Sequence, residues 1–252
     1  ISYSIYRVMD KTMIGAISNS VELGNYESAE KIINIPISFV TALGTVMLPH
    51  MSKLSEEEIK KNIYSSFELS FFIVCPMFVC LEIIADNFSN IFFGIEFTEV
   101  GNIIRILMFT TIFSAISNVV RTNYLIPTKK DKIYVKSTIY GSIANLILNT
   151  IFIKKYGSYG ACIGTIAAEL ILMLYQSYYA RKSIDFLKVF KIFIKYFWKS
   201  VIVGIPLILL ELLTLNNVIK LILQIFIAVA LYIMLNYKYI IYDFFGKKNN
   251  KV

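Results

Sequence analysis

Residues 7–15 read Arg-Val-Met-Asp-Lys-Thr-Met-Ile-Gly and place three charges inside an apolar run that otherwise resembles a membrane helix. A charged side chain at the bilayer centre costs at least ~2.5–3.5 kcal/mol on insertion scales, so these charges need partners or water in the folded protein. Because residues four apart share a helix face, Arg7 and Lys11 lie together and Asp10 lies beside them. Asp10 is expected to neutralise one cation, which leaves the face with a net positive charge.

The rest of the chain is also too apolar for a soluble domain. Of its 252 residues, 57% are hydrophobic and 15% are aromatic, whereas a soluble domain needs a largely polar surface. The net charge of +8 would suggest nucleic acid as a partner of a soluble protein, but in membrane proteins Lys and Arg collect in cytoplasmic loops. We therefore expect a multi-pass membrane protein that does not bind nucleic acid.

Eight apolar stretches have about the length needed to span a bilayer, which is ~20 residues. They cover residues 1–21, 32–52, 64–87, 102–126, 133–153, 159–180, 198–215 and 218–239. The predicted fold class is therefore an all-α polytopic membrane protein with about eight transmembrane helices. Residues 1–180 hold six helices, residues 181–195 form a basic amphipathic connection on the cytoplasmic membrane surface, and residues 196–252 hold two peripheral helices and a basic tail.

The cations in the connections fix an orientation. Most of them fall in residues 53–62, 128–132 and 181–195 and in the tail that holds Lys247, Lys248 and Lys251. By the positive-inside rule these segments are cytoplasmic. The first helix then runs outward, and the C-terminus is cytoplasmic.

Polar residues recur every three or four positions in several predicted helices, so each helix has one polar face. Three of these helices also carry ionised groups, which are difficult to satisfy in dry helix contacts. We therefore expect a water-filled cavity among residues 1–21, 102–126, 133–153 and 159–180. Its cations are Arg7, Lys11 and Arg121; its other polar side chains are Asp10, Ser114, Asn118, Ser142, Asn145 and Asn149.

Simpler interpretations of these residues stay open. The Ser and Thr positions are also consistent with hydrogen bonds between helices, worth about 0.6 kcal/mol each. Arg121 lies about five residues from a helix end, so it can extend to the membrane interface instead of binding a ligand. Glu169, near the middle of its helix, is either a protonatable coupling group or the partner of a cation on another helix.

No pattern for enzymatic chemistry is present. The chain has one histidine, no glycine-rich phosphate loop and no nucleophile with a plausible base. Its three cysteines lie in apolar runs without the spacing of a zinc site. We therefore expect no catalytic residues, no metal and no cofactor.

Four short patterns carry a resemblance to a known family. They are Asp10-Lys11-x-Met13-Ile14-Gly15, Gly24-x-Tyr26-Glu27-x-Ala29-x-Lys31, Leu48-Pro49-x-Met51-Ser52, and Asn145-x-x-x-Asn149 followed by Tyr156-Gly157-x-x-Gly160-Ala161. In order and spacing the chain resembles the C-terminal half of a bacterial oligosaccharide flippase. Such flippases form the polysaccharide transport family of the multidrug/oligosaccharidyl-lipid/polysaccharide exporter superfamily. His50 departs from the pattern, since relatives often have Arg or Lys there.

The resemblance implies one six-helix lobe of a two-lobe transporter, followed by two additional helices. It implies that the first lobe is absent, in agreement with a sequence that begins with Ile in what reads as the middle of a helix. The implied function is translocation of undecaprenyl-pyrophosphate-linked oligosaccharide repeats across the bacterial cytoplasmic membrane, by alternating access, for surface polysaccharide. Arg7 and Lys11 would then hold the pyrophosphate. Implied partners are this substrate, membrane lipid, a coupling ion (proton or sodium), and polysaccharide polymerase or export proteins.

Two other functions compete with this one. A drug or cation antiporter of the same superfamily would need a cavity rich in carboxylates, whereas the expected cavity here is rich in cations. A membrane glycan polymerase or acyltransferase would place catalytic residues in a large outer loop, and the longest outer connection expected here is residues 88–101.

Overall fold

The computed structural model describes residues 2–239, with side chains from residue 8 onward except that of Thr98. Within that range the chain is helical, as predicted. The helices are α1 (Ser2–Ile17), α2 (Ser20–Met51), α3 (Glu56–Phe93), α4 (Thr98–Val120), the π-helix η1 (Arg121–Leu125), α5 (Asp131–Tyr156), α6 (Ser158–Ala180), α7 (Phe186–Glu211) and α8 (Asn217–Leu235). Among these, α2, α3, α4 together with η1, α6, α7 and α8 are long and apolar enough to cross a membrane.

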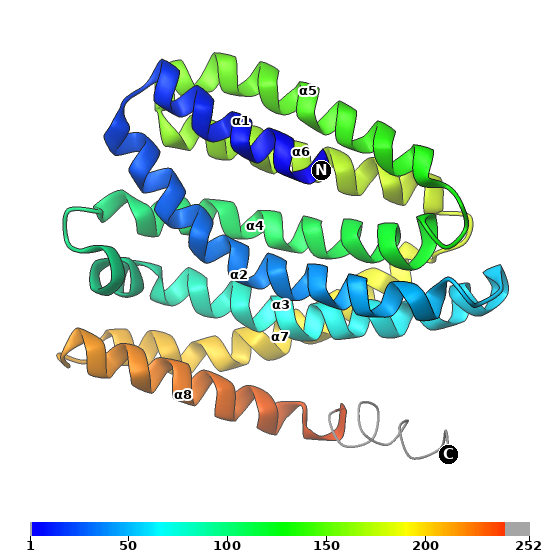
Figure 1. The fold of residues 1–252 in the computed structure, drawn as a ribbon. Helices are drawn as coiled ribbons and strands as arrows, with labels where there is room; N and C mark the ends of the chain where they lie inside the picture. Colours follow the sequence, from blue (N-terminus) through cyan, green and yellow to red (C-terminus); the bar gives the residue numbers. More distant parts are fainter. Residues whose placement is uncertain (1, 240–252) are drawn as a thin grey trace.

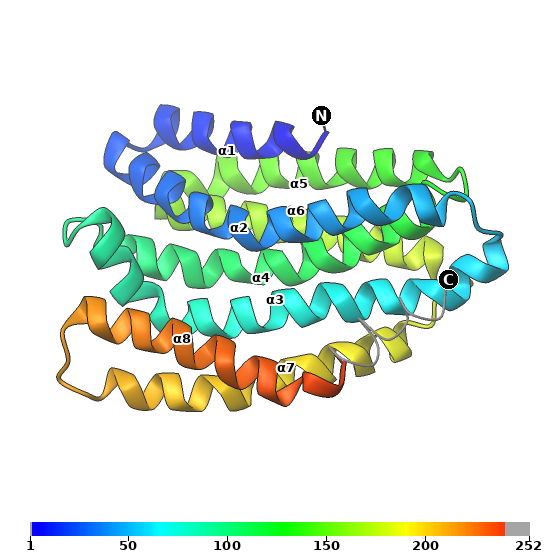
Figure 2. The ribbon, with the colours of Figure 1, turned by 60° about the horizontal axis from the view of Figure 1, so that its bottom comes forward.

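The helices lie side by side in one elongated bundle (Figures 1 and 2). α1, α5 and α6 form one edge, α2 and α4 the middle, α3 the next layer, and α7 and α8 the opposite edge. The turns after α2, η1 and α6 lie at one end of the bundle, which we call the basic end because these turns carry many of the cations of the chain. The turns after α1, α3, α5 and α7 lie at the opposite end.

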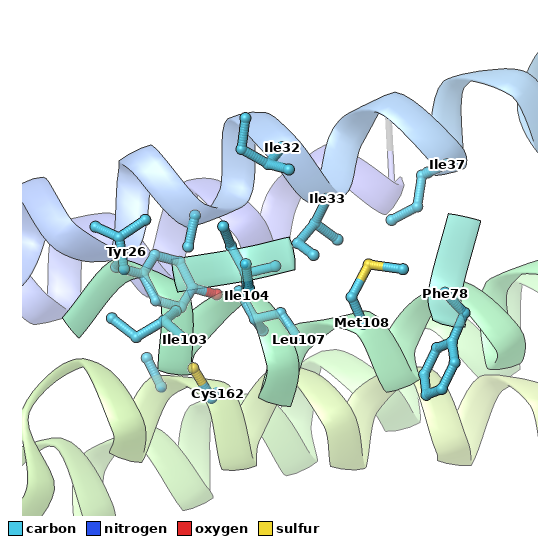
Figure 3. Packing of buried hydrophobic residues seen from close by; sticks show 14 of the residues in the cluster. Tyr26, Ile32, Ile33, Ile37, Phe78, Ile103, Ile104, Leu107, Met108 and Cys162 are labelled. Carbon is cyan, nitrogen blue, oxygen red and sulfur yellow. The ribbon is translucent and has the colours of Figure 1, made fainter. Parts of the chain in front are cut away.

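The main apolar core lies where α2 crosses α4. Ile33 and Ile37 of α2 pack with Ile104 and Met108 of α4, and Cys162 of α6 closes the same cluster (Figure 3). A second cluster, nearer the basic end, joins α3 to α7 through residues such as Phe71 and Tyr196. These two clusters hold the polar side chains of α1, α4, α5 and α6 in fixed positions.

The break between the first two helices differs from the predicted one. The sequence placed a connection between the predicted helices 1–21 and 32–52, but residues 22–31 lie inside α2. The side chain of Asn19 accepts hydrogen bonds from the backbone N–H groups of Val21 and Glu22, both at 3.0 Å, and so caps the start of α2. A good N-cap residue thus sets the helix boundary earlier than the apolar pattern predicted.

The amphipathic connection predicted at residues 181–195 is also different, because residues 186–195 form the first turns of α7. The helix continues there since Val189, Ile192 and Tyr196 are buried against α3, while the exposed cation Lys188 lies 3.9 Å from the ring centroid of Tyr64. α8 lies at the edge of the bundle, as expected for a peripheral helix. The division of the chain at residue 180 stays a prediction, and Lys247, Lys248 and Lys251 lie outside the described residues.

Candidate functional site

Asp10 is fully buried, and its carboxylate is held by polar side chains of three other helices. Its Oδ1 accepts hydrogen bonds from Asn145 Nδ2 at 2.8 Å and Asn149 Nδ2 at 2.6 Å. Its Oδ2 accepts from Thr165 Oγ1 at 2.7 Å and from Tyr26 OH at 3.0 Å. We call these five residues the Asp10 cluster. All of its hydrogen-bond donors to Asp10 are neutral, so the negative charge of an ionised Asp10 would be hydrogen-bonded but not neutralised by them.

The local sequence explains how this cluster forms. Asn145 and Asn149 are four residues apart on α5, so both amides point the same way. The small residues of α6 let that helix approach closely: a Cβ on Gly164 would lie 2.1 Å from Asn149 Oδ1, and one on Gly160 would lie 2.3 Å from a backbone atom of Phe152. Gly160 and Gly164 therefore let α6 pack closely against α5.

Lys11 pairs with Glu30 of α2 and not with Asp10. The distance from Lys11 Nζ to Glu30 Oε2 is 3.1 Å, and 34% of the Lys11 side chain is exposed. The expectation that Asp10 would neutralise a cation of its own helix is therefore wrong for Lys11, because Asp10 points into the contact with α5 and α6. The side chain of Arg7 lies outside the part that the structure describes.

A cavity of about 240 Å³ lies between α2, the end of α4, η1, α5 and α6. We call it the inner cavity. Its polar wall consists of Thr41, Ser114, Ser117, Asn118, Arg121, Tyr134, Glu169 and Gln176; its apolar wall consists of Ile37, Val40 and Leu172. The predicted cavity thus forms around α4, α5 and α6, with α2 in the place that the sequence assigned to α1.

Glu169 and Arg121 give the inner cavity a carboxyl group and a cation. Glu169 is 1% exposed, and its Oε2 accepts a hydrogen bond from Ser114 Oγ at 2.8 Å. Arg121 is the first residue of the π-helix and donates from Nη1 to Tyr134 OH at 3.3 Å. Its guanidinium carbon lies 5.1 Å from the centroid of the same ring. A single π-helical turn is a feature that often accompanies functional sites.

The sequence-predicted residues thus separate into different places. Ser114, Asn118, Arg121 and Glu169 line the inner cavity, and Asp10, Asn145 and Asn149 meet in the Asp10 cluster. Ser142 lies half-buried on α5, outside the cavity wall and the cluster. Whether any of them binds substrate stays a prediction.

The prediction missed several residues of these sites. Tyr26 and Thr165 complete the Asp10 cluster, and Glu30 is the partner of Lys11. A polar line on α2 was also missed; it consists of Glu30, Asn34, Ser38, Thr41 and Thr45, and we call it the α2 stripe. Its spacing of three or four residues was readable in the sequence. Its last three members are exposed, and Thr41 also borders the inner cavity.

Comparisons with known proteins agree with these features. The family described as polysaccharide biosynthesis protein matches residues 1–102. The chain is 26% identical over 178 residues to a probable low-salt glycan biosynthesis flippase of Haloferax volcanii, covering 69% of this chain and 38% of the relative. It is 23% identical over 175 residues to a putative O-antigen transporter of Shigella dysenteriae, covering 69% of this chain and 44% of the relative.

The fold has a close counterpart among solved structures. It matches the lipid II flippase MurJ in an inward closed conformation with a TM-score of 0.79 and 20% identity, over 96% of this chain and 52% of that one. The chain therefore spans about half of that protein and less than half of the curated relatives. The predicted resemblance to polysaccharide flippases is confirmed, and these relatives are named as transporters and not as enzymes.

Proposed function

Since the chain is related to the polysaccharide flippases, we propose that it forms one lobe of a transporter that moves a lipid-linked oligosaccharide from one membrane leaflet to the other. We further propose that the oligosaccharide is linked to undecaprenyl pyrophosphate and that the transporter lies in the bacterial cytoplasmic membrane, with the basic end in the cytoplasm. Transport proceeds by alternating access, in which the lobe moves against a second one. The match of 96% of this chain to about half of a flippase supports this arrangement.

The observation that carries the proposal is the charged pair at the exposed junction of α1 and α2. Lys11 and Glu30 lie well inside their helices, and a third of the Lys11 side chain is exposed. Lipid is a poor environment for an ion pair, so this surface faces water or other protein. The hydroxyls of Ser38, Thr41 and Thr45 donate to backbone carbonyls of their own helix. These members of the α2 stripe therefore have no unsatisfied hydroxyl donors.

We assign the recognition of the pyrophosphate to Lys11 together with Arg7. Both residues lie on one face of α1, one turn apart. Lys11 would exchange Glu30 for a phosphate oxygen, which it binds as a point charge, while Arg7 would bind through its planar fork. The inner cavity, at about 240 Å³, is too small for the sugar-phosphate part of such a substrate. Arg121, Ser114 and Asn118 are therefore assigned a secondary role beside the path.

The test is transport of a fluorescent lipid-linked oligosaccharide by the complete protein in proteoliposomes. We expect the double variant Arg7→Ala/Lys11→Ala to lose transport while it still inserts into the membrane. Lys31→Ala is the matched control, because Lys31 is an exposed cation of α2; this variant should transport normally. Normal transport by the double variant would refute the phosphate assignment.

A cation antiporter on the same fold is the second candidate, because the described residues include three buried carboxylates, Asp10, Glu30 and Glu169. A binding assay with the two kinds of ligand distinguishes the two functions. A flippase should bind an isoprenoid pyrophosphate and ignore a cationic dye, and an antiporter should do the reverse.

A further inference from the structure

The inner cavity has polar groups in its wall whose hydrogen bonds are not satisfied by the protein. Asn118 Oδ1, Arg121 Nε and Gln176 Oε1 are buried atoms without a hydrogen-bond partner among the described residues. All three side chains line the inner cavity, and Gln176 is only 1% exposed. Buried polar atoms are nearly always paired in folded proteins, so unpaired ones beside a cavity indicate a polar occupant. Because both donors and acceptors are unpaired here, that occupant must accept and donate hydrogen bonds.

The charged groups of the wall favour an occupant without net charge. Glu169 and Arg121 supply one carboxyl group and one cation, and the other described side chains of the wall are neutral. An ionised Glu169 would repel a phosphate, and Arg121 would repel a metal ion. A hydroxyl group both donates and accepts, so it can bond to the unpaired amide oxygens and to Arg121 alike. These groups together fit a neutral molecule that carries several hydroxyl groups.

The apolar wall and the size of the cavity indicate a single ring. Ile37, Val40 and Leu172 form the apolar wall, against which the C–H face of a sugar ring can pack while its hydroxyl groups reach the polar wall. Along α6, Glu169 lies seven residues from Gln176, which is ~10.5 Å. The volume of about 240 Å³ is below the roughly 300–1,000 Å³ of pockets for larger ligands. The cavity therefore suits one sugar residue and not an oligosaccharide.

A polar surface connects the inner cavity with the site assigned to the pyrophosphate. The cavity meets the α2 stripe at Thr41, which is exposed and also borders the cavity. Glu30, the partner of Lys11, begins the same stripe eleven residues earlier, or ~16.5 Å along α2. A sugar in the cavity is therefore separated from the pyrophosphate by other parts of the oligosaccharide, which can lie along the stripe.

We propose that the inner cavity is a selectivity site that binds one neutral sugar residue of the lipid-linked oligosaccharide. This inference rests on the proposed function and deepens it. Arg7 and Lys11 hold the pyrophosphate, which is common to substrates with different sugars, and the cavity distinguishes the sugars. Gln176 and Asn118 discriminate between them, because a sugar without a hydroxyl group opposite either amide leaves a buried oxygen atom unpaired.

Protection of a cysteine tests sugar binding without any need for transport. Ser117→Cys places a thiol on the cavity wall, and a small methanethiosulfonate reagent should modify it in the complete protein in detergent. At least one of the methyl glycosides of glucose, galactose, mannose and N-acetylglucosamine should slow this reaction. At about 100 mM the effect should be about tenfold, as a dissociation constant of about 10 mM gives. Tetrahydropyran, the same ring without hydroxyl groups, should have no effect.

Thr45→Cys is the matched control for this experiment. Thr45 is an exposed member of the α2 stripe and lies outside the cavity wall, so the glycosides should not change the reaction of a thiol there. The unsubstituted protein gives the background from its own cysteines, of which Cys75 and Cys162 are buried. An unreactive Ser117→Cys, no protection by any of the glycosides, or equal protection by tetrahydropyran would overturn the proposal.

Gln176→Ala tests whether the cavity recognises the sugar and not the pyrophosphate. It should weaken binding of an undecaprenyl-pyrophosphate-linked oligosaccharide that contains the protecting sugar by about tenfold, and leave binding of undecaprenyl pyrophosphate unchanged. Gln224→Ala is the matched control, because Gln224 is an equally buried glutamine of α8 outside the cavity wall; it should bind both ligands normally. Weakening of both ligands by Gln176→Ala, or of neither, would refute the selectivity site. If the unsubstituted protein binds the glycosides but moves no lipid-linked oligosaccharide, the proposed function fails and the sugar site stands.

Discussion

Lys11 pairs with Glu30 of α2 at 3.1 Å, although Asp10 precedes it directly in the sequence. Asp10 instead accepts four hydrogen bonds from neutral groups on three other helices. The two neighbouring charges therefore belong to different sites. One is a partly exposed ion pair, and the other is a buried carboxylate held by neutral hydrogen-bond donors.

The pairing of Lys11 predicts the result of a double-mutant cycle. Because a third of the Lys11 side chain is exposed, Lys11→Met and Glu30→Gln should show a coupling of only about 1 kcal/mol in the free energy of unfolding. Unfolding in detergent measures it. A cycle of Lys11→Met with Asp10→Asn should show less coupling, and the opposite order would contradict the observed pairing.

Removing Asp10 should lower the stability of the protein more than breaking the Lys11–Glu30 pair. Asp10→Ala takes away the acceptor of four donors inside the bundle, so we expect a loss of about 3 kcal/mol or more. Asp10→Asn keeps one carbonyl oxygen and should lose less. Thermal unfolding of the purified variants measures this, and Glu96→Ala, at an exposed position between α3 and α4, is the control with a change within about 0.5 kcal/mol.

Glu22 fixes the start of α2 to the start of α6. Its Oε2 accepts from the backbone N–H of Ser158 at 2.8 Å and also from the Ser158 hydroxyl. A carboxylate at a helix N-terminus is favoured by the helix dipole, so Glu22→Gln should lower stability by about 1 kcal/mol. Chemical unfolding followed by circular dichroism tests it. Glu57→Gln, at an exposed acid of α3, should have a smaller effect; equal losses would argue against the cap.

Arg105 joins α3 to α4 with two parallel hydrogen bonds to Asp86, at 2.9 and 2.6 Å. Lysine cannot reproduce this fork, so Arg105→Lys should be destabilising although the charge is kept. Since 60% of the Asp86 side chain is exposed, solvent screening limits the loss to about 1 kcal/mol. Lys60→Gln, which breaks a looser and exposed pair with Glu56 at 3.8 Å, is the control and should change the melting temperature less.

The sequence by itself determined the helical membrane fold and most of the polar residues inside it. Apolar runs of spanning length can form only helices or closed barrels in a bilayer, and polar residues at spacings of three and four mark helix faces. Ser114, Asn118, Arg121 and Glu169 were found in this way, and they do line one cavity. The pairs Asn145 with Asn149 and Gly160 with Gly164 were likewise readable, because residues four apart share a face.

Only the tertiary structure decided which faces meet. A helix periodicity says that a face is polar, but not which neighbour it contacts, since this depends on crossing points set by distant residues. Asn19 caps α2, so the helix starts at Ser20 and not at residue 32 as predicted. Gly164 allows α6 to approach α5 closely, and Asp10 lies in the contact with these two helices. In this way the charges of residues 7–15 were divided between sites, and α2 replaced α1 in the wall of the cavity.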